Sequence, residues 1–237
     1  MALTKAFLGS NVSGDGTPVS TFQLTVDSKG YTHLVCFVKH EGSPTTITED
    51  DNKGSGAYNL LTKVDHTNAD LSSRLMWVKI GTPGTGHTVT VTYGSAKPYS
   101  RLAVWGINSD AGDIALDVEA TAQGNGASFD AGTLTTTAAT VSFQGVGEYT
   151  FTTFDPGSGW TEDLDNNIFC QSRSDASSAT IDPVCTIPSG TMDWVTCAAS
   201  FKEVAGSGPG AGSDVSSVSV SESSTNLIRV NIIEETS

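Results

Sequence analysis

Apolar and polar residues alternate along most of this chain with the period of two that β-strands show. The alternation is strict over residues 87–93, which follow the apolar segment 74–80 across a TPGTG turn, so the two segments predict a hairpin. Residues 33–40 instead form an almost continuous apolar run, as expected of a central strand. No segment carries a convincing amphipathic helical pattern. The sequence therefore predicts an all-β protein.

Roughly ten to twelve such strands are expected, separated by turns rich in Gly, Pro, Asp and Asn. One antiparallel β-sandwich over residues 1–204, with jelly-roll-like topology, accounts for this pattern best. Gly145 and Gly147 lie inside one strand-like run and suggest a bulge or a bend there.

The end of the chain breaks this pattern. Residues 205–213 read AGSGPGAGS, a Gly/Ser/Pro linker, and residues 214–237 form a tail with two short strand-like runs. The tail is too small to bury a core of its own, so we expect its strands to lie on the sheet of a partner. The expected partner-binding residues are its apolar positions, Val218, Val220, Leu227, Ile228, Val230, Ile232 and Ile233.

Charge narrows the choice of partners. Twelve basic and 26 acidic residues give a net charge of −14, which argues against nucleic acid or an anionic membrane as a partner. Solubility explains this acidity, and cation binding is the alternative. No apolar stretch approaches the ~18 residues of a membrane span. The N-terminus lacks the pattern of a secretory signal, so we expect synthesis in the cytosol.

Four cysteines are too few for a disulfide framework in a chain of 237 residues. Cys36 and Cys197 lie in apolar strands and are expected to be buried thiols. Cys170 and Cys185 flank a 14-residue loop, and whether they pair is left open.

A search for chemistry finds no motif. His33, His40, His66 and His87 match no zinc-ligand spacing, and no serine stands in a G-x-S-x-G elbow. We therefore expect no catalytic residue, no cofactor and no metal, and a protein that is not an enzyme. Two acidic loops remain, with calcium at either of them as an open alternative to ordinary turn chemistry. They contain Glu49, Asp50 and Asp51, and Glu162, Asp163 and Asp165.

Tryptophan side chains form platforms for sugars when a ring face is exposed. Trp77 and Trp105 stand in apolar strands and are expected in the core. Trp160, in DPGSGWTED, is the tryptophan we expect to be most exposed, and with Tyr58 or Tyr99 it is the candidate glycan contact. Packing in the core or against a loop is the simpler explanation.

Several segments together resemble a known module. The run TFQLTVDSKGYTHLVCFVKHEGSPTTITEDDNKG, followed by YNLLTKVDHT, RLMWVKI and HTVTVTY, is similar to a β-sandwich module of tailed-bacteriophage structural proteins. The ending CAASFKEV resembles the closing strand of that module, and SVSVSES resembles the strand repeats that follow it. This chain has a short tail in place of a long repeat array.

The resemblance implies a virion component, such as a capsid decoration, neck, tail or fibre protein. We accordingly expect a non-enzymatic structural component of a phage particle, an exterior protein made in the host cytoplasm and attached through the tail by strand addition. Its expected partners are other virion proteins or sister copies, in a homo-oligomer that is a trimer by family analogy. The alternative is a carbohydrate-binding or adhesin module.

Overall fold

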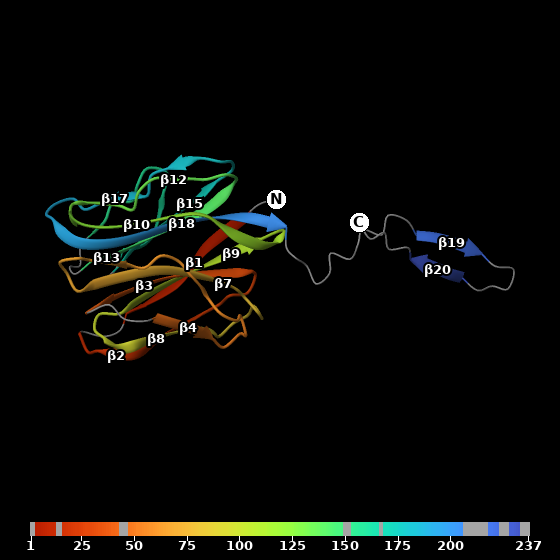
Figure 1. The fold of residues 1–237 in the computed structure, drawn as a ribbon, viewed down its shortest axis with the longest axis horizontal. Coiled ribbons are helices and arrows are strands. Elements are labelled where there is room, and N and C mark those ends of the chain that lie inside the picture. The colour runs from red at the N-terminus through yellow and green to blue at the C-terminus, as the bar shows by residue number, and fades with distance from the viewer. Residues whose placement is uncertain are drawn as a thin grey trace.

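The computed structural model describes residues 3–12, 16–42, 47–148, 153–165, 168–205, 218–222 and 228–232. Every regular element in these ranges is a β-strand, and the strands of residues 3–205 stack in layers (Figure 1). The prediction of an all-β protein built as an antiparallel sandwich is confirmed.

Sheet A lies at the centre of the stack, and its strands follow the order β1-β9-β3-β7-β5, with β6 also pairing with β7. Its long middle strand contains the continuous apolar run of the sequence, and side chains on both of its faces are fully buried. The strands of sheet A are β1 (Leu3–Val12), β3 (His33–Glu41), β5 (Asn59–Leu60), β6 (Val64–Asp65), β7 (Leu71–Lys79) and β9 (Arg101–Ser109).

Sheet B covers one face of sheet A and has the order β2-β8-β4. Its strands are β2 (Val19–Val26), β4 (Ile47–Asp51) and β8 (His87–Lys97). Met76 and Val78 of β7 pack with Val89 and Val91 of β8 in the core between these sheets. The hairpin predicted for these two strands is therefore wrong. The TPGTG turn instead carries the chain from one sheet to the other, which lets both apolar faces share one interior.

Sheet C covers the other face of sheet A and has the order β10-β18-β13-β15-β14. Its strands are β10 (Gly112–Gly126), β13 (Thr140–Glu148), β14 (Thr161–Asp165), β15 (Phe169–Asp175) and β18 (Met192–Ala205). The core between sheets A and C contains Phe37 and Trp105 from sheet A and Phe143 and Phe201 from sheet C, all fully buried.

Two short ribbons form the outer layer, which covers the far face of sheet C (Figure 1). They pair β11 (Ser128–Asp130) with β17 (Val184–Thr186), and β12 (Leu134–Thr135) with β16 (Thr180–Ile181). Phe129 packs here against Phe169 and Trp194.

The order of the strands repeats. In the first half, residues 3–109, sheet A pairs β1 with β9 and sheet B pairs β2 with β8. In the second half, residues 112–205, sheet C pairs β10 with β18 and the outer layer pairs β11 with β17. Each half thus joins its first strand to its last and its second to its last but one, as a jelly roll does. The strand order is therefore repeated once, with one half of the body as the repeated unit.

Gly145 and Gly147 stand in a regular part of sheet C, where β13 pairs with β15 and β18 without a shift of register. Of the two alternatives, the bulge is therefore wrong, and the bend stays a prediction. A Cβ at Gly145 would overlap the ring of Phe37, and one at Gly147 would lie 2.6 Å from Cγ of Lys39. These glycines let sheets A and C approach each other closely.

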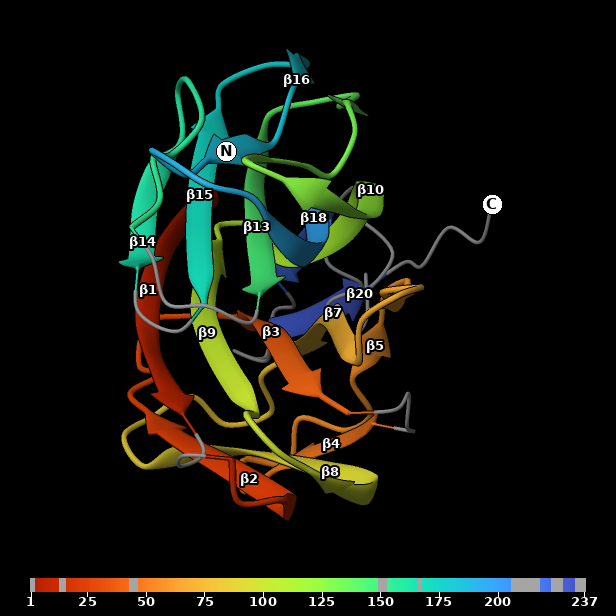
Figure 2. The same ribbon diagram turned by 90° about the vertical axis from the view of Figure 1, so that its left-hand side faces the viewer.

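The tail contains β19 (Val218–Glu222) and β20 (Ile228–Ile232), which pair with each other in an antiparallel sheet of their own (Figure 2 labels β20). The register places Val218 opposite Ile232 and Val220 opposite Val230. Leu227 and Ile233 lie outside the described residues. The boundaries predicted at 204 and 213 stay predictions, because residues 206–217 also lie outside them.

Candidate functional site

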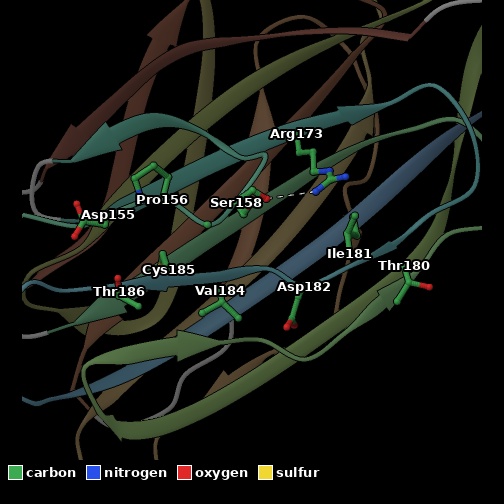
Figure 3. Close-up of a pocket in the computed structure, with 11 residues that line it drawn as sticks. Asp155, Pro156, Ser158, Arg173, Thr180, Ile181, Asp182, Val184, Cys185 and Thr186 are labelled. Atoms are coloured by element: carbon green, nitrogen blue, oxygen red, sulfur yellow. Dashed lines mark hydrogen bonds between the residues drawn. The ribbon is translucent and has the colours of Figure 1, made fainter.

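A pocket of about 320 Å³ opens in the second half, between the ribbon strands β16 and β17 and the segment 155–158 (Figure 3). Arg173 of β15 reaches across it toward Ser158. Asp155, Thr180, Asp182 and Thr186 line it as exposed polar residues. Sequence patterns do not single out these residues, because turn-forming Asp, Pro and Gly carry no periodic signal.

Backbone hydrogen bonds hold the segment 155–158 against β17. The amide of Asp155 donates to the carbonyl of Thr186 at 2.8 Å, and the amide of Thr186 donates back at 3.0 Å. The amide of Gly157 donates to Oε1 of Gln171 at 2.9 Å. A Cβ on Gly157 would overlap the carbonyl oxygen of Val184, so the wall of the pocket needs glycine at this position.

The charges around the pocket are unbalanced. The guanidinium of Arg173 donates to both carboxylate oxygens of Asp175, at 2.6 to 2.9 Å. Within the described residues, the carboxylates of Asp155 and Asp182 have no hydrogen bond or ion pair. Arg173 is thus already neutralised, and the pocket presents hydroxyls and two free carboxylates. Such a lining can bind a cationic group or a polyol.

A Ser–His–Asp chain exists elsewhere, in the first half. Nδ1 of His87 lies 2.9 Å from Oγ of Ser28, and Nε2 of His87 lies 3.4 Å from Oδ2 of Asp51. Ser28 and His87 are fully buried, so no substrate reaches the hydroxyl. Desolvation lowers the pKa of His87. The contacts among Ser28, His87 and Asp51 tie two turns to β4, because Ser28 also exchanges hydrogen bonds with the backbone of Gly84.

The two acidic loops do not gather their carboxylates. Asp50 is exposed, whereas its neighbour Glu49 is half-buried on β4, and desolvation raises the pKa of Glu49 to about 7. Both segments predicted as acidic loops are strands, β4 and β14, and in β14 Oδ2 of Asp163 accepts a hydrogen bond from the indole of Trp105 at 2.8 Å. Nowhere in the described part of the chain do three His, Cys, Asp or Glu side chains converge as metal ligands would. Calcium at these loops therefore gains no support.

Trp160 is buried, with 7% of its surface exposed, and it packs against Ala131, Leu134 and Ile181 of the outer layer. Its indole nitrogen donates to the carbonyl of Asp182 at 3.3 Å. The expectation of an exposed ring is therefore wrong: the ribbons of the outer layer cover it. Without an exposed ring face, Trp160 offers no stacking platform for a sugar.

The four cysteines are free and buried. Cys170 packs in the core between sheets A and C, whereas Cys185 packs in the outer layer with Phe129. Sheet C thus separates the two thiols whose pairing the sequence left open. Burial raises the pKa of both.

The histidines are also dispersed. His33 lies 3.1 Å from Asp113 at one end of sheet A, and His40 is fully buried against Tyr93 between sheets A and B. Nε2 of His66 contacts the carbonyl of Gly124 at 3.0 Å. Each of these three histidines contacts another residue of the fold, and none of them lines the pocket of the second half.

Comparisons with known proteins add little. No protein-family model matches the sequence, and no curated protein matches it. Among solved structures, the chain is weakly similar to the crystal structure of the PBSX exported protein XepA, with a TM-score of 0.25 and 8% identity over 83% of this chain and 86% of that chain. A TM-score this low supports no inference about fold or function. Within the described residues, no helix has the length and apolar character of a membrane span.

Proposed function

We propose that this protein is a non-enzymatic structural component of a bacteriophage particle, an exterior protein attached through its C-terminal tail. The observation that carries the proposal is the hairpin β19–β20, which forms a two-stranded sheet apart from the sheets of the body. An isolated two-stranded hairpin is at best marginally stable in water. A third strand or an apolar face from a partner would stabilise it, through backbone hydrogen bonds along its edge.

The register of the hairpin supports this use. The alternating apolar positions of the two strands are cross-strand partners, since Val218 and Val220 stand opposite Ile232 and Val230. Residues opposite each other in a ladder share one face of the sheet. By this register, Val218, Val220, Val230 and Ile232 share one face of the hairpin, which ends with Glu222 opposite Ile228, and each buried apolar side chain would contribute about 1.5–3 kcal/mol to docking.

The body supports the same proposal. Its apolar side chains fill cores between sheets A and B, between sheets A and C, and beneath the outer layer. A net charge of −14 disfavours adhesion to the packaged nucleic acid. The sequence resemblance to virion β-sandwich modules points to a phage particle, with sister copies or other virion proteins as partners. We place the protein in the virion after synthesis in the host cytoplasm, as a homo-oligomer that is a trimer by analogy.

Deletion of residues 206–237 tests the proposal. We expect the truncated protein to keep the circular dichroism and thermal unfolding of the full chain while losing incorporation into particles, measured by quantitative mass spectrometry of purified virions. Normal incorporation of the truncated protein would contradict the proposal.

A matched pair of full-length variants refines the test. Val230→Asp places a charge on the apolar positions of β20, and Asn231→Asp places the same charge one residue along, on the alternate positions. We expect the first variant to lose incorporation and the second to keep it. Equal behaviour of the two would show that the apolar face of the hairpin does not dock.

A further inference from the structure

The strand β1 forms one edge of the central sheet A. Within the described residues it pairs with β9 alone. The strand β3, two places further into the sheet, is buried on both faces, whereas most residues of β1 are only half-buried. An edge strand presents a row of backbone N–H and C=O groups that can pair with a further strand. The strand β1 is therefore a place where sheet A can be extended.

An apolar rim lies beside this edge. Leu3 and Phe7 of β1 and Leu164 of β14 pack against the core between sheets A and C while remaining half-buried. The indole of Trp105, on the neighbouring β9, donates to Asp163 of β14 at 2.8 Å, so the edge strand of sheet C lies at the same rim, as Figure 2 shows. A strand added beside β1 would place alternate side chains over this rim and exclude water from it.

Charge favours β1 over most other edge strands. The tail, residues 214–237, contains four acidic residues and one basic residue. The edge strands β4, β10 and β14 each contain three acidic residues, whereas β1 contains none and has one lysine, Lys5. Like charges that face each other across paired strands are destabilising. The tail should therefore avoid those three edges.

The remaining edges of sheets A and B are less suitable. The edge strand β2 also lacks acidic residues, but the carbonyl of Gln23 in β2 accepts a hydrogen bond from Asn11 of β1 at 2.5 Å, so part of that edge is already occupied. The edge at β5 spans only Asn59 and Leu60. Of the described edges with five residues or more, β1 is thus the candidate that remains.

The tail supplies a strand that fits this edge. In β20 the alternate positions 228, 230 and 232 are Ile, Val and Ile, whereas β19 carries Glu222 at the end of its corresponding series. Alternate residues of a strand belong to one face. The strand β20, placed beside β1, can therefore turn its apolar positions toward the rim at Phe7 and Leu164.

The tail leaves the body near the start of β1. Leu3 pairs with Ser109, whose hydroxyl donates to Oε1 of Glu203 near the end of β18 at 2.9 Å. Residues 206–217 can span about 40 Å when extended, which is long enough to reach β1 of the same chain. Yet β19 and β20 pair only with each other among the described strands. A second copy is therefore the better source, since each copy then both gives and receives a tail, which closes an oligomer.

We propose that the free edge of β1, with the apolar rim of Leu3, Phe7 and Leu164, receives the strand β20 from the tail of a second copy of this chain. The strand β20 extends sheet A with its apolar positions over the rim, and β19 becomes the outermost strand. This inference rests on the proposed function, in which the tail docks on a partner, and it names that partner and the docking surface.

Cross-linking between two full-length variants tests the proposal. One variant is isotope-labelled and carries Thr4→Cys, at an exposed position of β1, and the other carries Asn231→Cys in β20. Thr4 alternates with Leu3, and Asn231 alternates with Val230, so the docked strands would carry both new thiols on the face away from the rim. The four natural cysteines are buried, so a short bis-maleimide should join only the introduced thiols.

The expected result is a covalent heterodimer, identified by its mass. Docking raises the effective concentration of the two thiols, so we expect at least about tenfold more heterodimer than with the matched control Thr48→Cys. Thr48 is an exposed threonine on the acidic edge strand β4. Adding Val230→Asp to the tail variant should remove the excess, because the substitution places a charge at the rim.

The outcomes are distinct. Equal cross-linking at positions 4 and 48, together with loss of incorporation after deletion of residues 206–237, would overturn this docking surface and leave the proposed function intact. A cross-link that forms within a chain carrying both Thr4→Cys and Asn231→Cys, but not in the mixture, would overturn the second copy as the occupant. Selective cross-linking in the mixture, with normal incorporation after the deletion, would support the docking of copies and contradict the proposed function.

Discussion

The two halves of the body follow the same strand order and close it differently. In the first half, sheet B has three strands and packs over sheet A, and its interior holds ionisable groups such as His40, Glu49 and His87. In the second half, the outer layer is two short ribbons, and its interior holds aromatic rings and a thiol. The two halves thus share a strand order, whereas among the described residues β8 has a full third strand beside it and β17 has a single bridge, between Asp155 and Thr186.

Substitutions in the core between sheets A and C, which the two halves share, should lower the stability most. We expect Phe37→Ala to lower the free energy of unfolding by about 3–5 kcal/mol, because it leaves a cavity in the core between sheets A and C. Gly145→Ala should cost about 1–3 kcal/mol, since its Cβ meets the ring of Phe37. Urea unfolding measures both effects.

Combining these substitutions sharpens the test. In Phe37→Leu/Gly145→Ala, the smaller side chain makes room for the new methyl group, so the double variant should cost less than the sum of the two single variants. Gly126→Ala is the control, because its Cβ would meet nothing within 4 Å. Strict additivity would mean that close approach of the sheets is not the reason for glycine at position 145.

Substitutions in the segment 155–158 of the second half should have the next largest effect on stability. Gly157→Ala forces the segment 155–158 away from Val184, which we expect to cost about 1–3 kcal/mol. Hydrogen exchange should show faster exchange of the Thr186 amide, which donates to Asp155, while amides of β4 and β8 keep their protection. Equal loss of protection in both halves would mean that the halves do not respond separately.

Half-buried Glu49 in the first half should make stability depend on pH. Burial raises the pKa of Glu49 from the ordinary 4.5 to about 7, so the folded protein binds this proton more tightly than the unfolded chain does. The resulting stability is fully present below about pH 4.5 and is lost as the pH rises through 7. Glu49→Gln removes this loss, and unfolding free energies at pH 5 and 7.5 measure it.

The difference between wild type and variant isolates this effect from His40. Burial lowers the pKa of His40 from 6.5 to about 4, which gives a slope of the opposite sign over an overlapping range of pH. The stability of wild type relative to Glu49→Gln should therefore fall from pH 5 to pH 7.5. Parallel curves for the two proteins would contradict a raised pKa at Glu49.

The smallest effect concerns the thiols. Because burial raises the pKa of all four, we expect none to react with a thiol reagent in the native protein and all four to react after unfolding. Cys185, beside the pocket of the second half, should be the first to react under partial denaturation. Only two reactive thiols after unfolding would indicate a disulfide, against the separation of Cys170 and Cys185 by sheet C.

Sequence patterns predicted the elements better than their pairing. The apolar run of β3 correctly indicated a strand buried on both faces, and Trp105 is in the core as expected. The hairpin between β7 and β8 was wrong, because a short turn fits a crossing between two sheets as well as a turn within one. The prediction that Trp160 is exposed was wrong, because the ribbons that cover its ring are distant in the chain. Their residues Ala131, Leu134 and Ile181 are all more than 20 positions from Trp160.

The pocket was beyond the reach of sequence patterns. Asp155 and Asp182 are ordinary turn residues, and their relation appears only when β17 and the segment 155–158 come together. The tail is the opposite case: its linker composition and alternating apolar positions were visible from the start, and the structure added the register in which β19 and β20 pair.

The sequence by itself determined the all-β class, the acidic charge and the Gly/Ser/Pro composition of residues 205–213, because alternation, charge and composition are local properties of the chain. Only the tertiary structure decided which strands share a sheet, that Gly145 makes room for Phe37, and that Asp155 bridges to Thr186 of β17. Those features depend on contacts between residues far apart in the chain, which the local pattern of side chains does not specify.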